Sequence, residues 1–382
     1  MSFTLALPKI SLHGAGAIGD MVNLVCGKQW GKALIVTDGQ LVKLGLLDSL
    51  LSALAGHKMD YHLFDKVFPN PTEALVQDGY RAFQDNHCHY IIAFGGGSPI
   101  DTAKAINILT ANPGPSTGYS GVGKVTHPGV PLVAINTTAG TAAEMTSNAV
   151  IIDSERQVKE VIIDSNIIPD IAVDDASVML NIPASVTAAT GMDALTHAIE
   201  AYVSVGAHPL TDPSALEAIR LISQWLPQAV DNGHNLEARE MMAFGQYLAG
   251  MAFNSAGLGL VHALAHQPGA THNLPHGVCN AILLPIIENF NRPTAVARFA
   301  RIAQAMGVNT AVMDDEQASL AAIEAIRALS ARVGIPAGFS ALGISEQDID
   351  GWLDKALADP CAPCNPRPAS RDEVRALYLE AL

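Results

Sequence analysis

Short apolar runs in the first half of the chain constrain its fold more than any other feature. They are ALIVTD (33–38), MDYHLF (59–64), YIIAFGGG (90–97) and LVAINTT (132–138), and helical patterns separate them. An almost unbroken apolar run such as YIIAF is typical of a parallel strand buried on both faces. A strand with one face in solvent would instead alternate apolar and polar residues. The first half is therefore predicted to be an α/β domain with a mainly parallel sheet.

The spacing of apolar residues in the sequence changes near residue 180. The segment 149–164 predicts a hairpin that turns at Asp153 to Arg156, and IPDIAVDD (168–175) predicts a last strand. From about Pro183 onward, apolar residues recur at helical spacing instead. We therefore expect two domains, an α/β domain over residues 1–182 and an all-helical domain over residues 183–382.

Length and composition restrict the class of protein. The chain has 382 residues, enough for two apolar cores, and its net charge of -15 disfavours nucleic acid as a partner. It shows no basic segment followed by a long apolar run at its start and no membrane-spanning stretch, so we predict a soluble cytoplasmic protein. Its 5 cysteines are too scattered for a disulfide framework, and the redox alternative for Cys361 and Cys364 (C-x-x-C) has no second pair to support it.

The second half contains a cluster of residue types that bind metal ions. Asp193 and His197 lie four residues apart, which places both on one face of a helix. Imidazole and carboxylate together suit first-row divalent ions such as iron, zinc or manganese. Spacing alone leaves several candidate ligands open: Asp193, His197, His262, His266, His272 and His276.

A glycine-rich turn in the first half predicts a phosphate site. Gly95, Gly96, Gly97 and Ser98 follow the strand YIIAF and precede a helical segment that contains Asp101. Glycines let the backbone approach a ligand closely, and a helix N-terminus offers free N–H groups to a pyrophosphate. The pattern matches neither of the usual phosphate-loop fingerprints, so a glycine-rich turn without a ligand stays open.

Polar residues at two other predicted strand ends complete a nucleotide site. The segment from Asn136 to Thr141 follows an apolar strand, and ligands of open α/β sheets bind at such carboxyl ends. Asp38 ends the strand ALIVTD, where its carboxylate could bind an adenosine ribose and would repel a 2′-phosphate. We therefore predict NAD(H) rather than NADP(H). The acid precedes the glycines, so the domain would be a variant of the Rossmann plan.

Taken together, these motifs resemble the iron-dependent (group III) alcohol dehydrogenases, including the lactaldehyde and propanediol oxidoreductases. The resemblance runs through GGGSPIDTAK (95–104), NTTAGTAAEMT (136–146), ATGMDALTHAIEAY (189–202), AGMAFNSAGLGLVHALAHQPGA (249–270), NLPHGVCNAILLP (273–285) and CNPRP (364–368). It implies a Rossmann-like α/β domain joined to an all-α domain, an architecture shared with dehydroquinate synthases.

The same resemblance implies roles for individual residues. His266 would lie near the nicotinamide and relay a proton, and His272 would be outside the ligand set. The implied metal ligands are Asp193, His197, His262 and His276; the implied cofactor contacts are Asp38, Asn70, Gly96, Gly97, Ser98, Asp101, Thr137, Thr138, Thr141 and Lys159; and the implied substrate pocket contains Asn148, Phe253 and Cys361.

The function that the resemblance implies is a metal-dependent, NAD(H)-linked oxidoreductase that interconverts short primary alcohols or diols and aldehydes. A divalent ion, Fe(II) by resemblance or else Zn(II), would lower the pKa of the alcohol hydroxyl. A homodimer or larger homo-oligomer is expected by resemblance. The alternatives are a zinc polyol dehydrogenase of the glycerol type and a lyase like dehydroquinate synthase, whose sugar-phosphate substrate would require clustered basic residues.

Overall fold

The structure, a computed structural model, describes residues 3–156 and 158–382. It consists of two compact units. The α/β unit comprises Ala6–Thr138 and Ala142–Met179, and the helical unit is built on Leu180–Leu382 and also takes in Ala139–Thr141. The predicted fold class, a parallel α/β sheet followed by an all-helical region, is confirmed.

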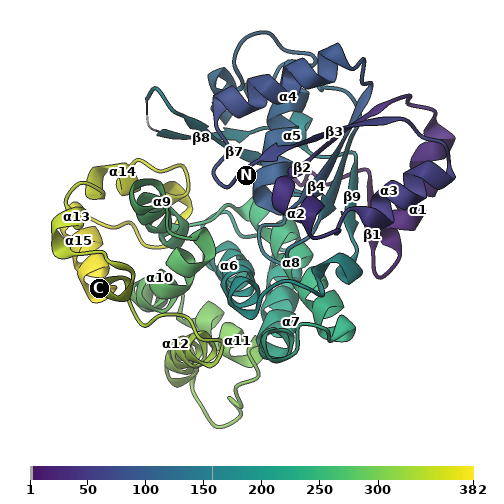
Figure 1. The fold of residues 1–382 in the computed structure, drawn as a ribbon. Coiled ribbons are helices and arrows are strands. Elements are labelled where there is room, and N and C mark those ends of the chain that lie inside the picture. Colours follow the sequence, from purple (N-terminus) through teal and green to yellow (C-terminus); the bar gives the residue numbers. More distant parts are fainter. Residues whose placement is uncertain (1–2, 157) are drawn as a thin grey trace. The chain divides into compact units, whose positions relative to one another are not determined.

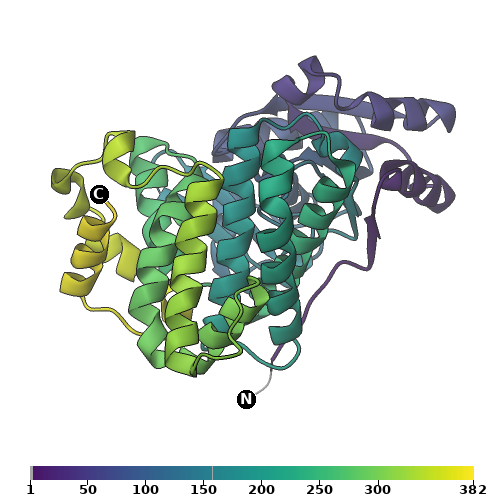
Figure 2. The same cartoon turned by 90° about the horizontal axis from the view of Figure 1, so that it is seen from below.

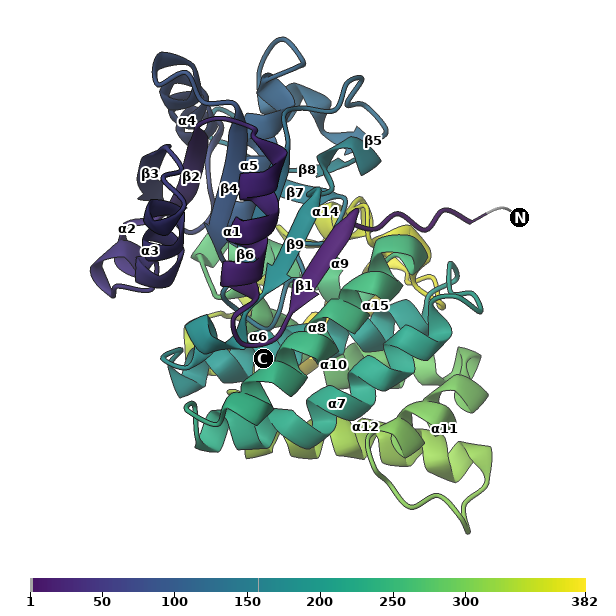
Figure 3. The ribbon, with the colours of Figure 1, turned by 90° about the vertical axis from the view of Figure 1, so that its right-hand side faces the viewer.

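The main sheet of the α/β unit is entirely parallel, with the strand order β1-β9-β6-β4-β2-β3 (Figure 1). The helices α1 and α3 pack on one face of it, and α4 and α5 pack on the other (Figures 1 and 3). Its elements are β1 (Ile10–His13), α1 (Ala17–Lys28), β2 (Ala33–Asp38), α2 (Gly39–Lys43), α3 (Asp48–Gly56), β3 (Tyr61–Val67), α4 (Glu73–Asp85), β4 (Tyr90–Gly95), α5 (Gly97–Leu109), β6 (Leu132–Asn136) and β9 (Ile171–Asp174).

Burial explains why the apolar runs predicted these strands well. Every residue of β4 and β6 is buried, as are the first five of β2, because helices cover both faces of the sheet. The edge strand β3 alternates with exposed residues and begins at Tyr61, two residues later than predicted. Sequence reasoning missed the other edge strand, β1, whose four residues are only half-buried.

A small second sheet has the order β5-β8-β7. The predicted hairpin is present, since β7 (Asn148–Asp153) pairs with β8 (Val158–Ile163) in antiparallel register. The two-residue strand β5 (Gly121–Val122) was not predicted. The short 3-10 segments of this unit are η1 (Ser116–Tyr119), η2 (Ser165–Ile167) and η3 (Ala176–Met179).

The helical unit contains no strand within Leu180–Leu382, all of which the structure describes. Its long helices run side by side, coloured teal to light green in Figure 2. The helices are α6 (Ala184–Val203), α7 (Asp212–Asp231), α8 (Leu236–Ala256), α9 (Leu260–His272), α10 (His276–Asn291), η4 (Arg292–Thr294), α11 (Val296–Ala305), α12 (Asp315–Arg332), η5 (Phe339–Leu342), α13 (Glu346–Ile349), α14 (Leu353–Leu357), η6 (Ala362–Cys364) and α15 (Arg371–Glu380).

No single helix among the described residues is long and apolar enough to cross a membrane. Only α8 and α9 taken together meet the criteria of length and composition, and they are bent by 105°.

Glycine at position 277 allows α10 to approach α6 closely. A Cβ atom added to Gly277 would lie 2.3 Å from the carbonyl oxygen of Ala189 and 3.3 Å from the Cβ of Asp193. The nearer atom belongs to helix backbone, which cannot move aside alone. The separation of α6 and α10 therefore depends on the missing side chain.

We expect Gly277→Ala to lower the free energy of unfolding by about 1–3 kcal/mol, because the methyl group would force α10 away from α6. Thermal and urea denaturation would measure the change. Gly19→Ala in α1 is the matched control, since a Cβ there would meet nothing within 4 Å. A Gly277→Ala protein as stable as the control would contradict the close approach.

Candidate functional site

Three of the predicted metal ligands come together in the helical unit. One carboxylate oxygen of Asp193 and one ring nitrogen each of His262 and His276 all lie within 4.8 Å of one another. The Nε2 atoms of His262 and His276 are 3.9 Å and 3.6 Å from Asp193 Oδ1. The residues come from α6, α9 and the first position of α10, so the cluster depends on how these three helices pack.

The fourth predicted ligand, His197, lies beside this group, one turn after Asp193 on α6. Its ring stacks on the ring of His262 with a centroid distance of 4.6 Å and on that of Phe253 at 4.4 Å. Burial lowers the pKa of His197, although the charge of Asp193 opposes the shift. The imidazole is therefore neutral, which is the form that binds metal ions.

The Asn280 side chain provides a test of whether the cluster fits a cation. Its Nδ2 lies 2.6 Å from Asp193 Oδ1, 3.1 Å from His262 Nε2 and 3.0 Å from His276 Nε2. An amide nitrogen carries two hydrogens, so it cannot satisfy three acceptors at once. Three acceptors that converge on one point are the donor set of a divalent ion. Sequence reasoning missed Asn280, although its spacing of four from His276 was visible.

A buried carboxylate fixes the orientation of His262. Glu200 Oε2 contacts His262 Nδ1, and Glu200 Oε1 accepts hydrogen bonds from the backbone N–H groups of Val261 (2.7 Å) and His262 (3.4 Å). A hydrogen on Nδ1 in this contact leaves the lone pair on Nε2, which faces Asp193. Burial, together with the His197 and His276 rings, lowers the pKa of His262 well below its usual value.

A second histidine of α9 also contacts a carboxylate. His266 Nδ1 lies 2.7 Å from Asp359 Oδ2, and its ring stacks on that of His276 at 5.4 Å. Asp359 was not predicted, because it lies 93 positions away in the chain. Cys361, predicted to line the substrate pocket, follows two residues later, and both it and Cys364 are free thiols.

His272, at the end of α9, is separate from the cluster. Its ring meets the Trp352 ring edge-on at 5.8 Å, and its Nε2 lies 3.5 Å from Asp348 Oδ1. The histidine that spacing left as a candidate ligand is thus an exposed residue with other partners.

The glycine-rich turn of the α/β unit lets its backbone come close to neighbouring side chains. Gly95 has a φ of +150°, and a Cβ there would lie 2.5 Å from the Cγ of Pro99. A Cβ on Gly96 would lie 3.0 Å from Thr138 Oγ1. The turn leads directly into α5, which begins at Gly97 and includes Ser98 in its first turn. Free N–H groups and a helix dipole are therefore available to an anion.

The strand ends β4, β6 and β9 are in register at the same edge of the sheet, since Gly95 pairs with Asn136 and Asn136 with Asp174. Asn136 Nδ2 donates to Asp174 Oδ1 (3.0 Å), and Asn136 Oδ1 accepts from the backbone N–H of Thr138 (3.1 Å). Thr137, which is buried, donates its backbone N–H to Gly95 (3.1 Å). These bonds hold the two polar loops side by side.

The remaining predicted cofactor contacts are distributed over both units. Asp38 caps α2, because its Oδ1 accepts from the backbone N–H groups of Gln40 and Leu41, each at 2.9 Å. Asn70 has a left-handed backbone with φ of 59°, and Lys159 lies half-buried on β8. Thr141 belongs to the short segment Ala139–Thr141 of the helical unit.

Two predicted residues contact the interior of the α/β unit. Asp101 Oδ2 accepts a hydrogen bond from the backbone N–H of Val150 (3.1 Å), and burial raises the pKa of Asp101 to about 6 against the opposing charge of Lys104. The carbonyl oxygen of Asn148 accepts from Lys104 Nζ (2.8 Å). These contacts join α5 to β7 beneath the glycine turn.

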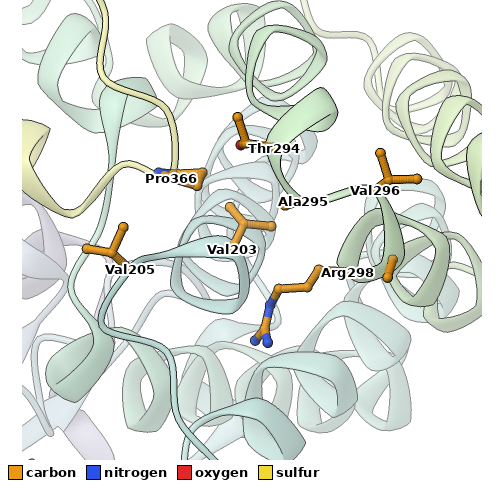
Figure 4. A pocket seen from close by; sticks show the side chains of 8 residues that line it. Val203, Val205, Thr294, Ala295, Val296, Arg298 and Pro366 are labelled. Carbon is orange, nitrogen blue, oxygen red and sulfur yellow. The ribbon is translucent and has the colours of Figure 1, made fainter. Parts of the chain in front are cut away.

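A cavity of about 560 Å³ lies elsewhere in the helical unit, between the end of α6 and the start of α11 (Figure 4). The charged side chain at this cavity, Arg298, already pairs with Asp212 (2.5 Å) and lies over the Tyr202 ring at 4.0 Å. None of the predicted site residues lines it. Its lining residues are Val203, Val205, Thr294, Ala295, Val296, Ala297, Arg298 and Pro366.

Comparison with known proteins agrees with both halves of this description. The family model "Iron-containing alcohol dehydrogenase" matches residues 8–176, and "Fe-containing alcohol dehydrogenase family, C-terminal" matches residues 187–382.

Individual relatives match along the whole chain. The NAD-dependent methanol dehydrogenase of Bacillus methanolicus is 43% identical over 98% of this chain and 99% of its own length. The 1,3-propanediol dehydrogenase of Citrobacter freundii is 44% identical over 99% and 98%, respectively. A crystal structure of a 1,3-propanediol oxidoreductase superposes with a TM-score of 0.98 at 42% identity and covers 100% of both chains. The resemblance inferred from the motifs is confirmed, and the chain belongs to the iron-containing alcohol dehydrogenase family.

Proposed function

We propose that this enzyme interconverts short primary alcohols or diols and the matching aldehydes with NAD(H), and that Asp193, His197, His262 and His276 bind its divalent metal. The convergence of Asp193 Oδ1, His262 Nε2 and His276 Nε2 on the single amide nitrogen of Asn280 supports this ligand set most directly. Family membership favours Fe(II). Zn(II) is the alternative, because three imidazoles and a carboxylate also suit it.

The metal would supply Lewis-acid chemistry, which makes the hydroxyl of an alcohol more acidic and polarises the carbonyl of an aldehyde. NAD(H) would accept or donate the hydride. The protein's own contribution is to hold the buried His197 and His262 rings, whose pKa values burial lowers, beside the partly exposed His276, with Glu200 Oε2 in contact with His262 Nδ1. Burial excludes water, which strengthens every charge interaction at the reacting oxygen.

Cofactor binding is assigned to the turn of the α/β unit from Gly95 to Ser98. Gly96, Gly97 and Ser98 present the N-terminus of α5 to the pyrophosphate, and Thr137 and Thr138 border it. Asp38 would bind the adenosine ribose through Oδ2, because Oδ1 caps α2. Asn70, Thr141 and Lys159 remain predicted cofactor contacts, and Asp101 would act indirectly by anchoring α5 to β7.

His266 is the proposed proton relay. Its side chain is 21% exposed, whereas that of His262 is 2% exposed, so His266 can exchange protons with solvent from within the cluster of rings. Oxidation of an alcohol releases one proton besides the hydride. Histidine is the side chain that most often carries out such a proton transfer.

The substrate class follows from the size and polarity of the surroundings. Phe253 provides an apolar wall next to His197, and Cys361 and Asn148 are the predicted polar contacts. Relatives named for methanol and 1,3-propanediol support short primary alcohols and diols. A glycerol-type polyol dehydrogenase with zinc would use the same chemistry. A cytoplasmic location and a homodimer or larger assembly stay predictions.

His262→Ala should lose bound metal and NAD-linked alcohol oxidation, whereas His266→Ala should keep one equivalent of metal and retain a reduced, measurable turnover with a changed pH profile. Metal analysis of the purified proteins and absorbance at 340 nm, with methanol, ethanol, 1-propanol and both propanediols as substrates, would measure the two effects. Chelator treatment followed by Fe(II) or Zn(II) would identify the ion. Metal retained by His262→Ala would show that the ligand set is wrong.

Glu200→Gln should weaken metal binding about 10- to 100-fold, the usual effect of removing a carboxylate behind a ligand histidine. The amide would offer a hydrogen to His262 Nδ1 and so favour the tautomer whose Nε2 is protonated and cannot bind metal. Competition with a chelator would measure the affinity.

Glu288→Gln is the matched control for Glu200→Gln. Burial raises the pKa of Glu288 to about 8, and Glu288 Oε2 accepts a hydrogen bond from Asn291 Nδ2 (3.2 Å), so an amide replaces it without changing a contact of His262. We expect its metal affinity to stay within about twofold of the wild type. Equal losses in the two variants would indicate a general packing defect instead of a tautomer effect.

Asp38→Asn should lower the preference for NAD over NADP, measured as the ratio of kcat/KM values, by about tenfold, because it removes a charge that repels the 2′-phosphate. Asparagine caps helices as well as aspartate does, so the melting temperature should not change. Asp38→Ala, which removes the charge and the cap together, should also lower stability. An unchanged preference in both variants would exclude Asp38 from the ribose site.

A further inference from the structure

Asp359 lies in a loop, yet both oxygens of its carboxylate contact other residues. It lies between the end of α14 and the start of η6, and its side chain is 9% exposed. Oδ2 lies 2.7 Å from His266 Nδ1, and Oδ1 accepts a hydrogen bond from the backbone N–H of Cys361 at 2.9 Å. Both oxygens of the carboxylate are therefore engaged, and one of them holds a histidine of the candidate site.

The charge on Asp359 decides which nitrogen of His266 carries the hydrogen. Burial alone would raise the pKa of Asp359, but hydrogen bonds from His266 and Cys361 outweigh burial and hold it below its usual value. An ionised carboxylate only accepts hydrogen bonds, so His266 must donate from Nδ1. In a neutral imidazole the other nitrogen, Nε2, then carries the lone pair.

His262 and His266 of α9 each contact a carboxylate through Nδ1, but they differ in exposure to solvent. His262 contacts Glu200 through Nδ1, as His266 contacts Asp359, and the residues are one helical turn apart. His262 is buried among the metal-binding rings, whereas His266 is partly exposed. The same tautomer can therefore serve metal binding at the first position and proton transfer at the second.

Cys361 completes the arrangement. Its side chain is hydrogen-bonded to Asp359, and burial followed by the charge of Asp359 raises the pKa of the thiol well above its usual value. The thiol stays protonated and donates to the carboxylate. A residue predicted to contact substrate thus also holds Asp359 in place.

A second metal site is the competing explanation of the same residues, because donor atoms of His266, Asp359 and Cys361 lie within 4.8 Å of one another. The 2.7 Å separation of His266 Nδ1 and Asp359 Oδ2 is that of a charge-assisted hydrogen bond with a proton between the atoms. A metal ion would have to displace that proton and the thiol proton. The observed distance favours the hydrogen bond.

We propose that Asp359 is the positioning residue of the proton relay: through the contact of Oδ2 with Nδ1 it holds the ring of His266 as the Nδ1–H tautomer, so that the lone pair of Nε2 is available to the proton released by the alcohol. This inference rests on the proposed function. In alcohol oxidation the substrate loses a hydride to NAD and a proton to His266 Nε2, which passes the proton to solvent. The charge on Asp359 does not change during the transfer.

Asp359→Asn is the variant that tests the proposal, with Asp354→Asn as the control on the exposed side of α14, where Asp354 is paired with Arg371. In the metal-loaded enzyme, Asp359→Asn should lower kcat at least tenfold, leave KM for the alcohol within about twofold and keep one equivalent of metal. In a His266→Ala background the same substitution should have no further effect on kcat. An equal loss of kcat in that background would overturn the proposal.

The tautomer itself gives a readout that does not depend on turnover. In zinc-loaded protein with ¹⁵N-labelled histidine, the His266 ring should show a protonated Nδ1 in the wild type and in Asp354→Asn, and lose that pattern in Asp359→Asn. A wild-type ring protonated at Nε2, or a second equivalent of metal that disappears in Cys361→Ser, would overturn the inference with turnover intact. Absence of NAD-linked turnover in the wild type would instead overturn the proposed function.

Discussion

The contact between Glu200 and the N-terminus of α9 is the interaction on which the candidate site depends. Glu200 is buried on α6, yet it accepts hydrogen bonds from the first N–H groups of α9 and from the His262 ring. Burial and the neighbouring Glu288 raise the pKa of Glu200 well above its usual value, and the hydrogen bonds from the backbone of α9 oppose that shift. One side chain thus fixes the distance between two helices and the orientation of a ligand.

The α/β unit uses a buried charge in a comparable way. Lys104 on α5 is fully buried, and its Nζ donates to the carbonyl oxygens of Thr146 (2.7 Å) and Asn148 (2.8 Å). Burial lowers the pKa of Lys104 to about 8, although Asp101 and Glu144 oppose the shift. These hydrogen bonds fix α5 against the segment at the start of β7. They therefore also fix the position of the glycine turn, which leads into α5. In both units, polar contacts made away from solvent determine where the site residues lie.

Features that depend on residues close together in the chain could be predicted from the sequence, whereas contacts between distant residues could not. The buried strands β2, β4 and β6 were predicted well because each is a continuous apolar run, whereas the half-buried β1 and the two-residue β5 carry no such pattern. Asp193 and His197, two proposed ligands on α6, were predicted from a spacing of four. Asp359 and Glu200 were missed because their partners lie 93 and 62 positions away, and only packing brings them together.

The two roles proposed for Asp38 would restrict how cofactor preference can evolve in this protein. One oxygen of its carboxylate caps α2, and the other is assigned to the ribose. A lineage under selection for the phosphorylated cofactor would have to remove the charge and still keep an acceptor for two backbone N–H groups. Asparagine, serine and threonine satisfy both conditions, whereas larger or apolar side chains would unravel the start of the helix. Few substitutions of Asp38 could therefore change the cofactor preference and still keep the start of α2 intact.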